Sequence, residues 1–74
     1  MGKLTKAQAA FLRYAARDGG ADYYRAVEGG GSGRTIGTLE ERGLVVEAPR
    51  SPVGRTWRIT PAGRLALQEH TDDR

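Results

Sequence analysis

The hydrophobic pattern of this chain changes its period at Leu44, and this change limits the folds that the chain can form. Before Leu44 the apolar residues recur mainly at helical spacing. After it, the run 44–47 is strand-like, and in the run 55–60 side chains expected to point inward alternate with side chains expected to point outward. The segment 48–54 between the two runs holds two prolines and a glycine, which is typical of a hairpin loop. The pattern therefore predicts helices followed by one two-stranded ribbon, in which we expect Trp57 to point inward.

Polar cap residues indicate where the first two helices begin. Thr5, followed three residues later by Gln8, makes a capping-box pattern, and the apolar spacing behind it predicts an amphipathic helix over 5–17. Asp22 is expected to cap a shorter helix that ends in the glycine-rich stretch 29–33. We expect this second helix to bury one of its two adjacent tyrosines together with two smaller apolar residues, that is, Tyr23 or Tyr24 with Ala26 and Val27.

The third expected helix spans 33–42, with Ser32 as its cap. At about 100° per residue, Ile36 and Leu39 point to one side of this helix, toward the core. The opposite side is polar and has short side chains near its N-terminal half. It carries Arg34, Thr38 and Glu41, with Thr35 and Arg42 on one flank.

A last helix is expected after the second strand-like run. Thr60 and Pro61 have the pattern of a cap followed by proline at the first helical position. The inner stripe of this helix is expected to consist of Ala62, Leu65 and Ala66. Residues 1–68 are then expected to form one domain and 69–74 a polar C-terminal tail.

Two sequence patterns resemble those of a known family. The first, LExRGLV, begins at Leu39, and the second, RxxRxTxxGR, begins at Arg55. With the order of elements, they resemble the winged helix-turn-helix domain of MarR-type and related bacterial transcriptional regulators over residues 4–67. The resemblance implies an α+β fold of three helices, a two-stranded hairpin wing and a C-terminal helix. It also implies double-stranded DNA as partner, with helix 33–42 in the major groove and the wing 48–58 on the backbone or in the minor groove.

The basic residues are consistent with contacts to phosphate. The net charge is +3, and ten arginines stand against two lysines, so most of the positive groups can bind phosphate oxygens in pairs. The window 50–64 holds four arginines and no acid, and Arg34 suits the acceptors of guanine. The expected DNA-contacting residues are Arg34, Thr35, Thr38, Arg42, Arg50, Arg55, Arg58 and Tyr23.

Several classes of function have no support in the residues. The chain has no cysteine and a single histidine, so we expect no metal and no cofactor, and without a paired acid and base or an activated nucleophile we expect no enzyme. The longest apolar run is too short for a membrane span, and a cytoplasmic protein of a bacterium or phage is expected. The helices that larger MarR-type regulators use for dimerisation and ligand binding are not in this sequence, so no small-molecule effector is expected. A homodimer through the first and last helices is the expected assembly.

A second interpretation keeps the fold but changes the partner. The glycine-rich corner 29–33, Gly37 within the third helix, and the acids Glu40 and Glu41 are not typical of a helix that reads bases. They favour a winged-helix module that binds another protein and has no DNA binding of its own.

Overall fold

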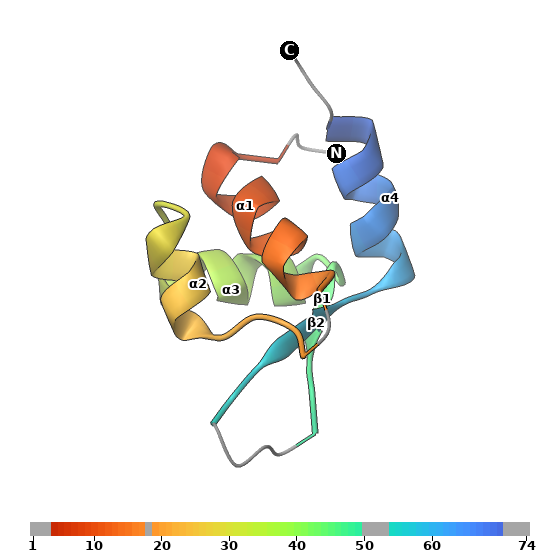
Figure 1. Cartoon of the computed structure of the whole chain (residues 1–74). Helices are drawn as coiled ribbons and strands as arrows, with labels where there is room; N and C mark the ends of the chain where they lie inside the picture. The colour runs from red at the N-terminus through yellow and green to blue at the C-terminus, as the bar shows by residue number, and fades with distance from the viewer. Residues whose placement is uncertain (1–3, 18, 50–53, 71–74) are drawn as a thin grey trace.

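The computed structural model describes residues 4–17, 19–49 and 54–70 of the 74-residue chain (Figure 1). Within these residues the chain forms four helices and a two-stranded antiparallel sheet, which confirms the small α+β fold. The elements follow one another in the order α1 (Lys6–Ala15), α2 (Tyr23–Glu28), α3 (Gly33–Glu41), β1 (Val45–Glu47), β2 (Trp57–Ile59) and α4 (Pro61–His70).

The predicted caps start the first three helices. The Gln8 N–H donates to Thr5 Oγ1 and the Thr5 N–H donates to Gln8 Oε1, both at 3.0 Å, so the capping box ahead of α1 is complete. Asp22 accepts from the Arg25 N–H at 3.1 Å ahead of α2, and Ser32 caps α3. The expected helix over 5–17 is shorter in the structure, because α1 ends at Ala15.

The core lies where α1 crosses α3 and meets the sheet (Figure 1). Phe11 and Leu12 of α1 and Leu39 of α3 are fully buried, and Ile36 is buried beside them. Trp57 of β2 completes this core at 5% exposure, with its ring edge-on to Phe11 at 6.4 Å between centroids. The expectation that Trp57 points inward is confirmed.

A third chain segment joins the sheet beside β2. In the hairpin, β1 pairs with β2 so that Val45 faces Ile59 and Glu47 faces Trp57. On the other side of β2, the Ala21 N–H donates to the Trp57 carbonyl at 2.9 Å and the Trp57 N–H donates to the Ala21 carbonyl at 2.8 Å. Gly20 permits this approach, because it has a positive φ of 74° and a Cβ there would collide with the Trp57 carbonyl. The turn after α1 is thereby tied to the hairpin.

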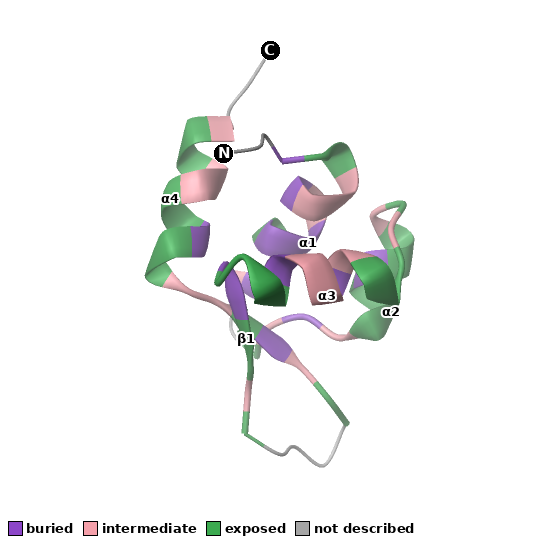
Figure 2. Ribbon diagram, turned by 180° about the vertical axis from the view of Figure 1, so that it is seen from behind, coloured by how far each residue is buried: buried purple, intermediate pink, exposed green. Residues whose placement is uncertain are grey.

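The burial expected for α2 is confirmed at Ala26 and is wrong for the tyrosines and Val27. Among its residues only Ala26 is buried, whereas Tyr23, Tyr24 and Val27 are 49%, 74% and 48% exposed (Figure 2). The reason lies in the glycine that follows the helix. A Cβ at Gly29 would lie only 2.8 Å from the Ala10 Cβ of α1. The backbone at the end of α2 therefore approaches α1 closely and leaves no space for a large side chain between the two helices.

The inner side of α4 also differs from the prediction. Its core-facing residues are Gly63, Ala66 and Leu67, whereas Ala62 and Leu65 are exposed, so only Ala66 of the expected stripe is confirmed. Gly63 sets this orientation, because a Cβ there would collide with the Leu44 carbonyl oxygen and lie 2.7 Å from Ile59 Cγ1. The helix also continues to His70, so residues 69 and 70 of the expected tail are helical.

Candidate nucleic-acid interface

The exposed side of α3 begins with Arg34. Its neighbours Ile36 and Leu39 are buried, which fixes α3 in the core and turns the Arg34 side chain to solvent. Within the described residues, the Arg34 guanidinium has no ion pair and no side-chain hydrogen bond, and its backbone N–H donates to Ser32 Oγ at 3.2 Å. Thr38 lies one turn further along and is half-buried. The exposed side of α3 therefore offers a cation and a hydroxyl group to a partner.

Thr35 has a structural role in the same turn. Its Oγ1 accepts the Ser32 N–H at 3.2 Å, which completes the capping box of α3. The side chain is half-buried and lies against Gly31, where a Cβ would collide with it. Thr35, one of the expected contact residues, therefore uses its hydroxyl group to cap α3.

Tyr23 is placed beside the start of α3. Its Cε1 lies 3.5 Å from the position that a Cβ on Gly33 would occupy, and its ring is edge-on to Tyr24 at 6.3 Å. Because the ring is half exposed, its hydroxyl group is available at the corner between α2 and α3. The structure therefore brings Tyr23 and Arg34 to one end of α3, as the sequence-based set requires.

The expected uncompensated charge of the wing is reduced at Arg55. Its Nε donates to Glu47 Oε2 at 2.9 Å and its Nη2 donates to Glu47 Oε1 at 3.0 Å, a bidentate pair across the hairpin. The hydrogen bond from Arg55 holds the pKa of the Glu47 carboxyl below its usual range. Arg55 also lies over the Trp57 ring at 5.0 Å. No acid is present in 50–64, but Glu47 stands just before that window and neutralises this arginine.

Arg58 lies on the other face of β2. Trp57 points toward α3, where its Nε1–H donates to Glu40 Oε2 at 2.9 Å, and successive residues of a strand point to opposite faces. Arg58 therefore points away from α3. Its Cγ lies 3.4 Å from where a Cβ of Gly20 would be, and its cross-strand partner is the exposed Val46. The structure thus separates Arg58 from Arg34.

A further expected residue, Arg42, lies at the edge of this surface. Arg42 is the C-cap residue of α3, where its N–H donates to the Thr38 carbonyl at 3.1 Å, and its side chain is exposed. Arg50 lies outside the described residues. The structure therefore assembles Tyr23, Arg34 and Thr38 at α3.

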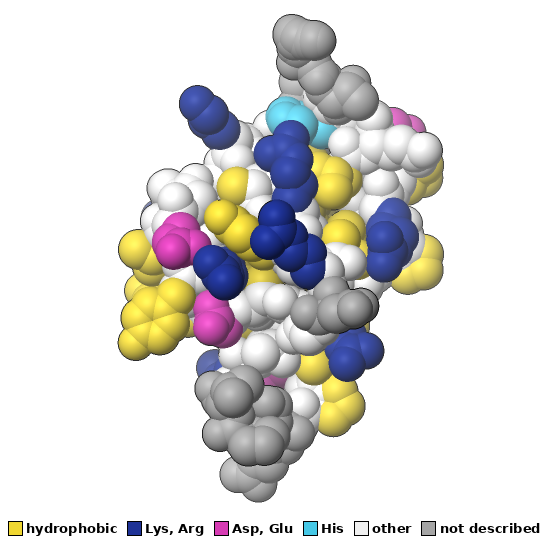
Figure 3. Space-filling model, viewed as in Figure 1, with side chains coloured by type: hydrophobic (Ala, Val, Ile, Leu, Met, Phe, Trp, Pro, Cys, Tyr) yellow, Lys and Arg dark blue, Asp and Glu magenta, His cyan; other side chains and the backbone are white. Residues whose placement is uncertain are grey.

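Sequence reasoning missed a group of basic side chains on the opposite side of the molecule. Figure 3 shows Lys and Arg side chains gathered over α1 on the side that faces the viewer. The exposed basic residues of α1 and of the turn after it are Lys6, Arg13 and Arg17, and the sequence signal for them is the absence of any acid from 6–17. Arg17 and Arg25 both lie over the Tyr14 ring, at 5.3 and 5.0 Å from its centroid.

Comparisons of the chain with protein-family models, curated proteins and solved structures find no match. Among the described residues, no helix has the length and apolar character needed to cross a bilayer. The same residues contain no group of three or more His, Cys, Asp or Glu side chains suited to hold a metal ion. The function of the chain is therefore inferred from the surfaces described above.

Proposed function

We propose that this chain is a winged helix-turn-helix protein that binds double-stranded DNA, with α3 in the major groove and the β1–β2 hairpin beside it as the wing. The observation that carries the proposal is the exposed Arg34 in the first turn of α3, with no acidic partner among the described residues. The order of elements supports it, because three helices precede the hairpin and Ala21 adds a bridge to β2. A MarR-like regulator would arrange its elements in this order.

The position of Arg34 favours an anionic or acceptor-rich partner. A cation in the first turn of a helix is disfavoured by some tenths of a kcal/mol, since that end of the helix dipole is positive. A phosphate or a guanine edge beside the guanidinium would reverse this sign. Tyr23 stands next to the same turn and can donate its hydroxyl to a backbone phosphate.

The hairpin is linked to α3, so the two elements can dock as a unit. The hydrogen bond from Trp57 Nε1 to Glu40 joins β2 to the middle of α3. This bond also directs one of the two acids of α3, Glu40, toward the hairpin. Glu41 remains exposed, which favours a pose in which the first half of α3 lies deeper in the groove than the second.

The proposal is tested by fluorescence anisotropy of a labelled mixed-sequence duplex at about 50 and about 200 mM salt. Arg34→Ala should weaken binding roughly tenfold, since a good arginine contact contributes about 1–3 kcal/mol. The matched control is Arg25→Ala, which makes the same change in net charge on α2, where Glu28 already pairs with the guanidinium at 2.8 Å. Wild-type affinity in Arg34→Ala, or no binding by the wild type at the lower salt, would overturn the proposal.

A second function is favoured by one observation on α2. Tyr23, Tyr24 and Val27 are exposed on a six-residue helix, and this apolar surface suits contact with another protein. If the chain instead serves as a protein-binding module, Tyr24→Ala should abolish capture of a partner from nuclease-treated lysate. Capture that requires intact DNA would count against this function.

A further inference from the structure

The exposed side of α1 carries cations that the proposed function does not use. Lys6 and Arg13 are seven residues apart and so lie within about 20° of one line along the helix. Arg17 follows in the turn after α1, and all three side chains are exposed. Together with Arg58 and Arg64 we call these residues the α1 basic face.

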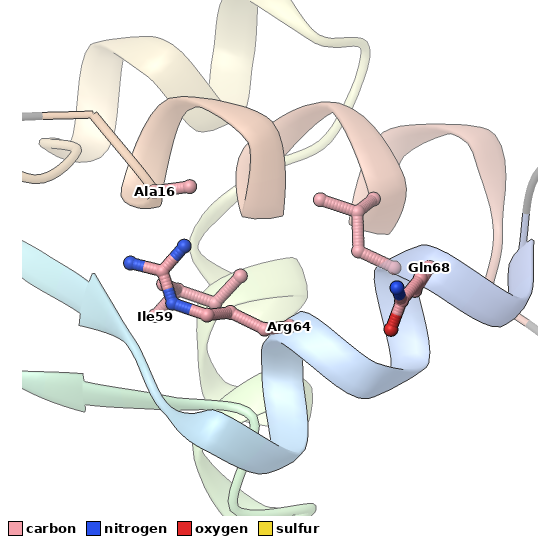
Figure 4. A pocket seen from close by; sticks show the side chains of 5 residues that line it. Ala16, Ile59, Arg64 and Gln68 are labelled. Atoms are coloured by element: carbon pink, nitrogen blue, oxygen red, sulfur yellow. The ribbon is translucent and has the colours of Figure 1, made fainter.

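The last two members come from other elements and converge on the end of α1. Arg64 of α4 lines a hollow of about 420 Å³ together with Ala16, and Figure 4 shows its side chain extending along the hollow toward Ala16. Arg58 of β2 lies beside Gly20, in the turn that follows α1. Three separate elements therefore bring guanidinium groups to one end of α1.

The charge of this face is not compensated within the described residues. None of its five members has a carboxylate within ion-pair distance there, and α1 itself contains no acid. In Figure 3 Lys and Arg side chains extend over α1, and acidic side chains border them on the left of the view. A surface of this kind attracts a polyanion and releases its condensed counterions.

The residue types favour phosphate over carboxylate-rich protein. Four of the five members are arginines, whose planar fork binds two phosphate oxygens at once. Arg17 lies over the Tyr14 ring at 5.3 Å, which holds the guanidinium in place while its N–H edge stays available. An arginine held in this way, with other exposed arginines near it, suits the repeated phosphates of a duplex backbone.

The α1 basic face and the exposed side of α3 point in opposite directions. Phe11 and Leu12 turn the inner side of α1 toward α3, and Ile36 and Leu39 turn the inner side of α3 toward α1. The two views from front and back show α1 nearer in one and α3 nearer in the other (Figures 1 and 2). The molecule is 37 × 23 × 21 Å, so a single duplex with a persistence length of about 150 bp would have to bend sharply to reach both sides.

We propose that the α1 basic face binds the phosphate backbone of a second duplex, so that one chain joins two DNA segments. The joining rests on the proposed function, since α3 must hold the first duplex. The contact at α1 is independent of base sequence, because it consists of cations that bind phosphates and places no element in a groove.

The test is a capture assay with two duplexes, one fixed to beads and one fluorescent, run beside single-duplex anisotropy. The α1 variant carries Lys6→Gln, Arg13→Gln and Arg17→Gln, all at exposed positions. The control carries Arg25→Gln with Glu28→Gln and so removes a neutral pair on the neighbouring helix. Circular dichroism confirms that each variant is folded, and light scattering gives its oligomeric state.

Wild type and control should capture the fluorescent duplex, and the α1 variant should lose at least tenfold in capture while its single-duplex affinity falls only a few fold. Arg34→Ala should weaken single-duplex binding roughly tenfold and should reduce capture with it. Capture by the α1 variant at the wild-type level would overturn the inference and assign joining to a dimer. If the α1 variant loses all binding while Arg34→Ala keeps it, the α1 face is the sole DNA site and the proposed use of α3 fails with the joining. Polyglutamate serves as a second probe. If wild type binds polyglutamate, the α1 variant loses this binding, and wild type captures no second duplex, the inference is overturned in favour of an acidic protein as partner.

Discussion

Two helical glycines should respond in opposite ways to the same substitution by alanine. Gly63 is buried in the first turn of α4, where a Cβ would collide with the Leu44 carbonyl oxygen and approach Ile59 Cγ1 to 2.7 Å. Gly37 lies in the middle of α3, where a Cβ would meet nothing within 4 Å. Neither residue has a positive φ, so neither substitution is opposed by the backbone conformation.

The magnitudes follow from these surroundings. Overpacking at Gly63 costs about 1–3 kcal/mol. Moving α4 away to relieve it would stretch the hydrogen bond from the Thr60 N–H to the Leu44 carbonyl, now 3.0 Å, at a cost of about 1 kcal/mol. The gain in helix propensity offsets up to about 1 kcal/mol, so Gly63→Ala should destabilise the fold by about 2 kcal/mol. Gly37→Ala has only the gain and should stabilise it by about 0.5–1 kcal/mol.

Thermal unfolding followed by circular dichroism measures both effects. In a domain of this size, 1 kcal/mol shifts the melting temperature by about 4–8 °C. We therefore expect Gly63→Ala to melt about 10 °C below the wild type and Gly37→Ala about 4 °C above it. Equal stability of Gly63→Ala and wild type would refute the close packing of α4 on Leu44 and β2. A lower melting temperature for Gly37→Ala would show that α3 needs a glycine at this position.

Three other outcomes are expected from the hairpin and its contact with α3. Glu47→Gln removes the negative charge that pairs with Arg55 and should raise duplex affinity several-fold at about 50 mM salt. The control, Glu47→Gln with Arg55→Gln, should bind like wild type. Unchanged affinity in the single variant would place Arg55 away from DNA. The hydrogen bond from Arg55 lowers the pKa of Glu47 in the folded chain, so the contribution of the pair to stability is present above the usual glutamate range and is lost as pH falls through the lowered pKa. An NMR titration of the Glu47 carboxyl should therefore have a lower midpoint in wild type than in Arg55→Gln, and equal midpoints would contradict the pairing. Glu40→Ala leaves Trp57 Nε1 without its acceptor and should shift the fluorescence of Trp57 and cost about 1 kcal/mol, whereas Glu41→Ala should change neither.

The starts of the helices could be predicted because each depends on residues three positions apart. Thr5 with Gln8, and Asp22 and Ser32 with the amides that follow them, form their cap hydrogen bonds in the structure as the sequence indicates. The inward side of the second strand was also predictable, since alternation alone places Trp57 in the core.

The orientations of α2 and α4 could not be predicted from apolar periodicity. In both cases a glycine allows two backbones to approach, Gly29 against α1 and Gly63 against Leu44. Periodicity gives weight to large apolar side chains, and so it assigned Val27 and Leu65 to the core. The close approach of a backbone depends on the tertiary fold, and these two side chains are exposed as a result.

The candidate site could be predicted only where it depends on local sequence. Exposure of Arg34 follows from the helical spacing that buries Ile36. The pairing of Arg55 with Glu47 joins residues eight positions apart and depends on the hairpin, so the local charge of 50–64 did not indicate it. The α1 basic face draws on three elements, and only their packing reveals it as one surface.

The bridge between Ala21 and Trp57 also affects how this chain meets copies of itself. An open sheet edge is a template on which another chain can add a strand, and natural proteins cover or shorten such edges. Ala21 occupies the outer edge of β2 with two hydrogen bonds, so a neighbouring chain finds that edge already taken. Within the described residues, the edge that remains belongs to β1, which is three residues long and ends in the charged Glu47. The short loop after α1 thus protects this small domain against edge-to-edge aggregation.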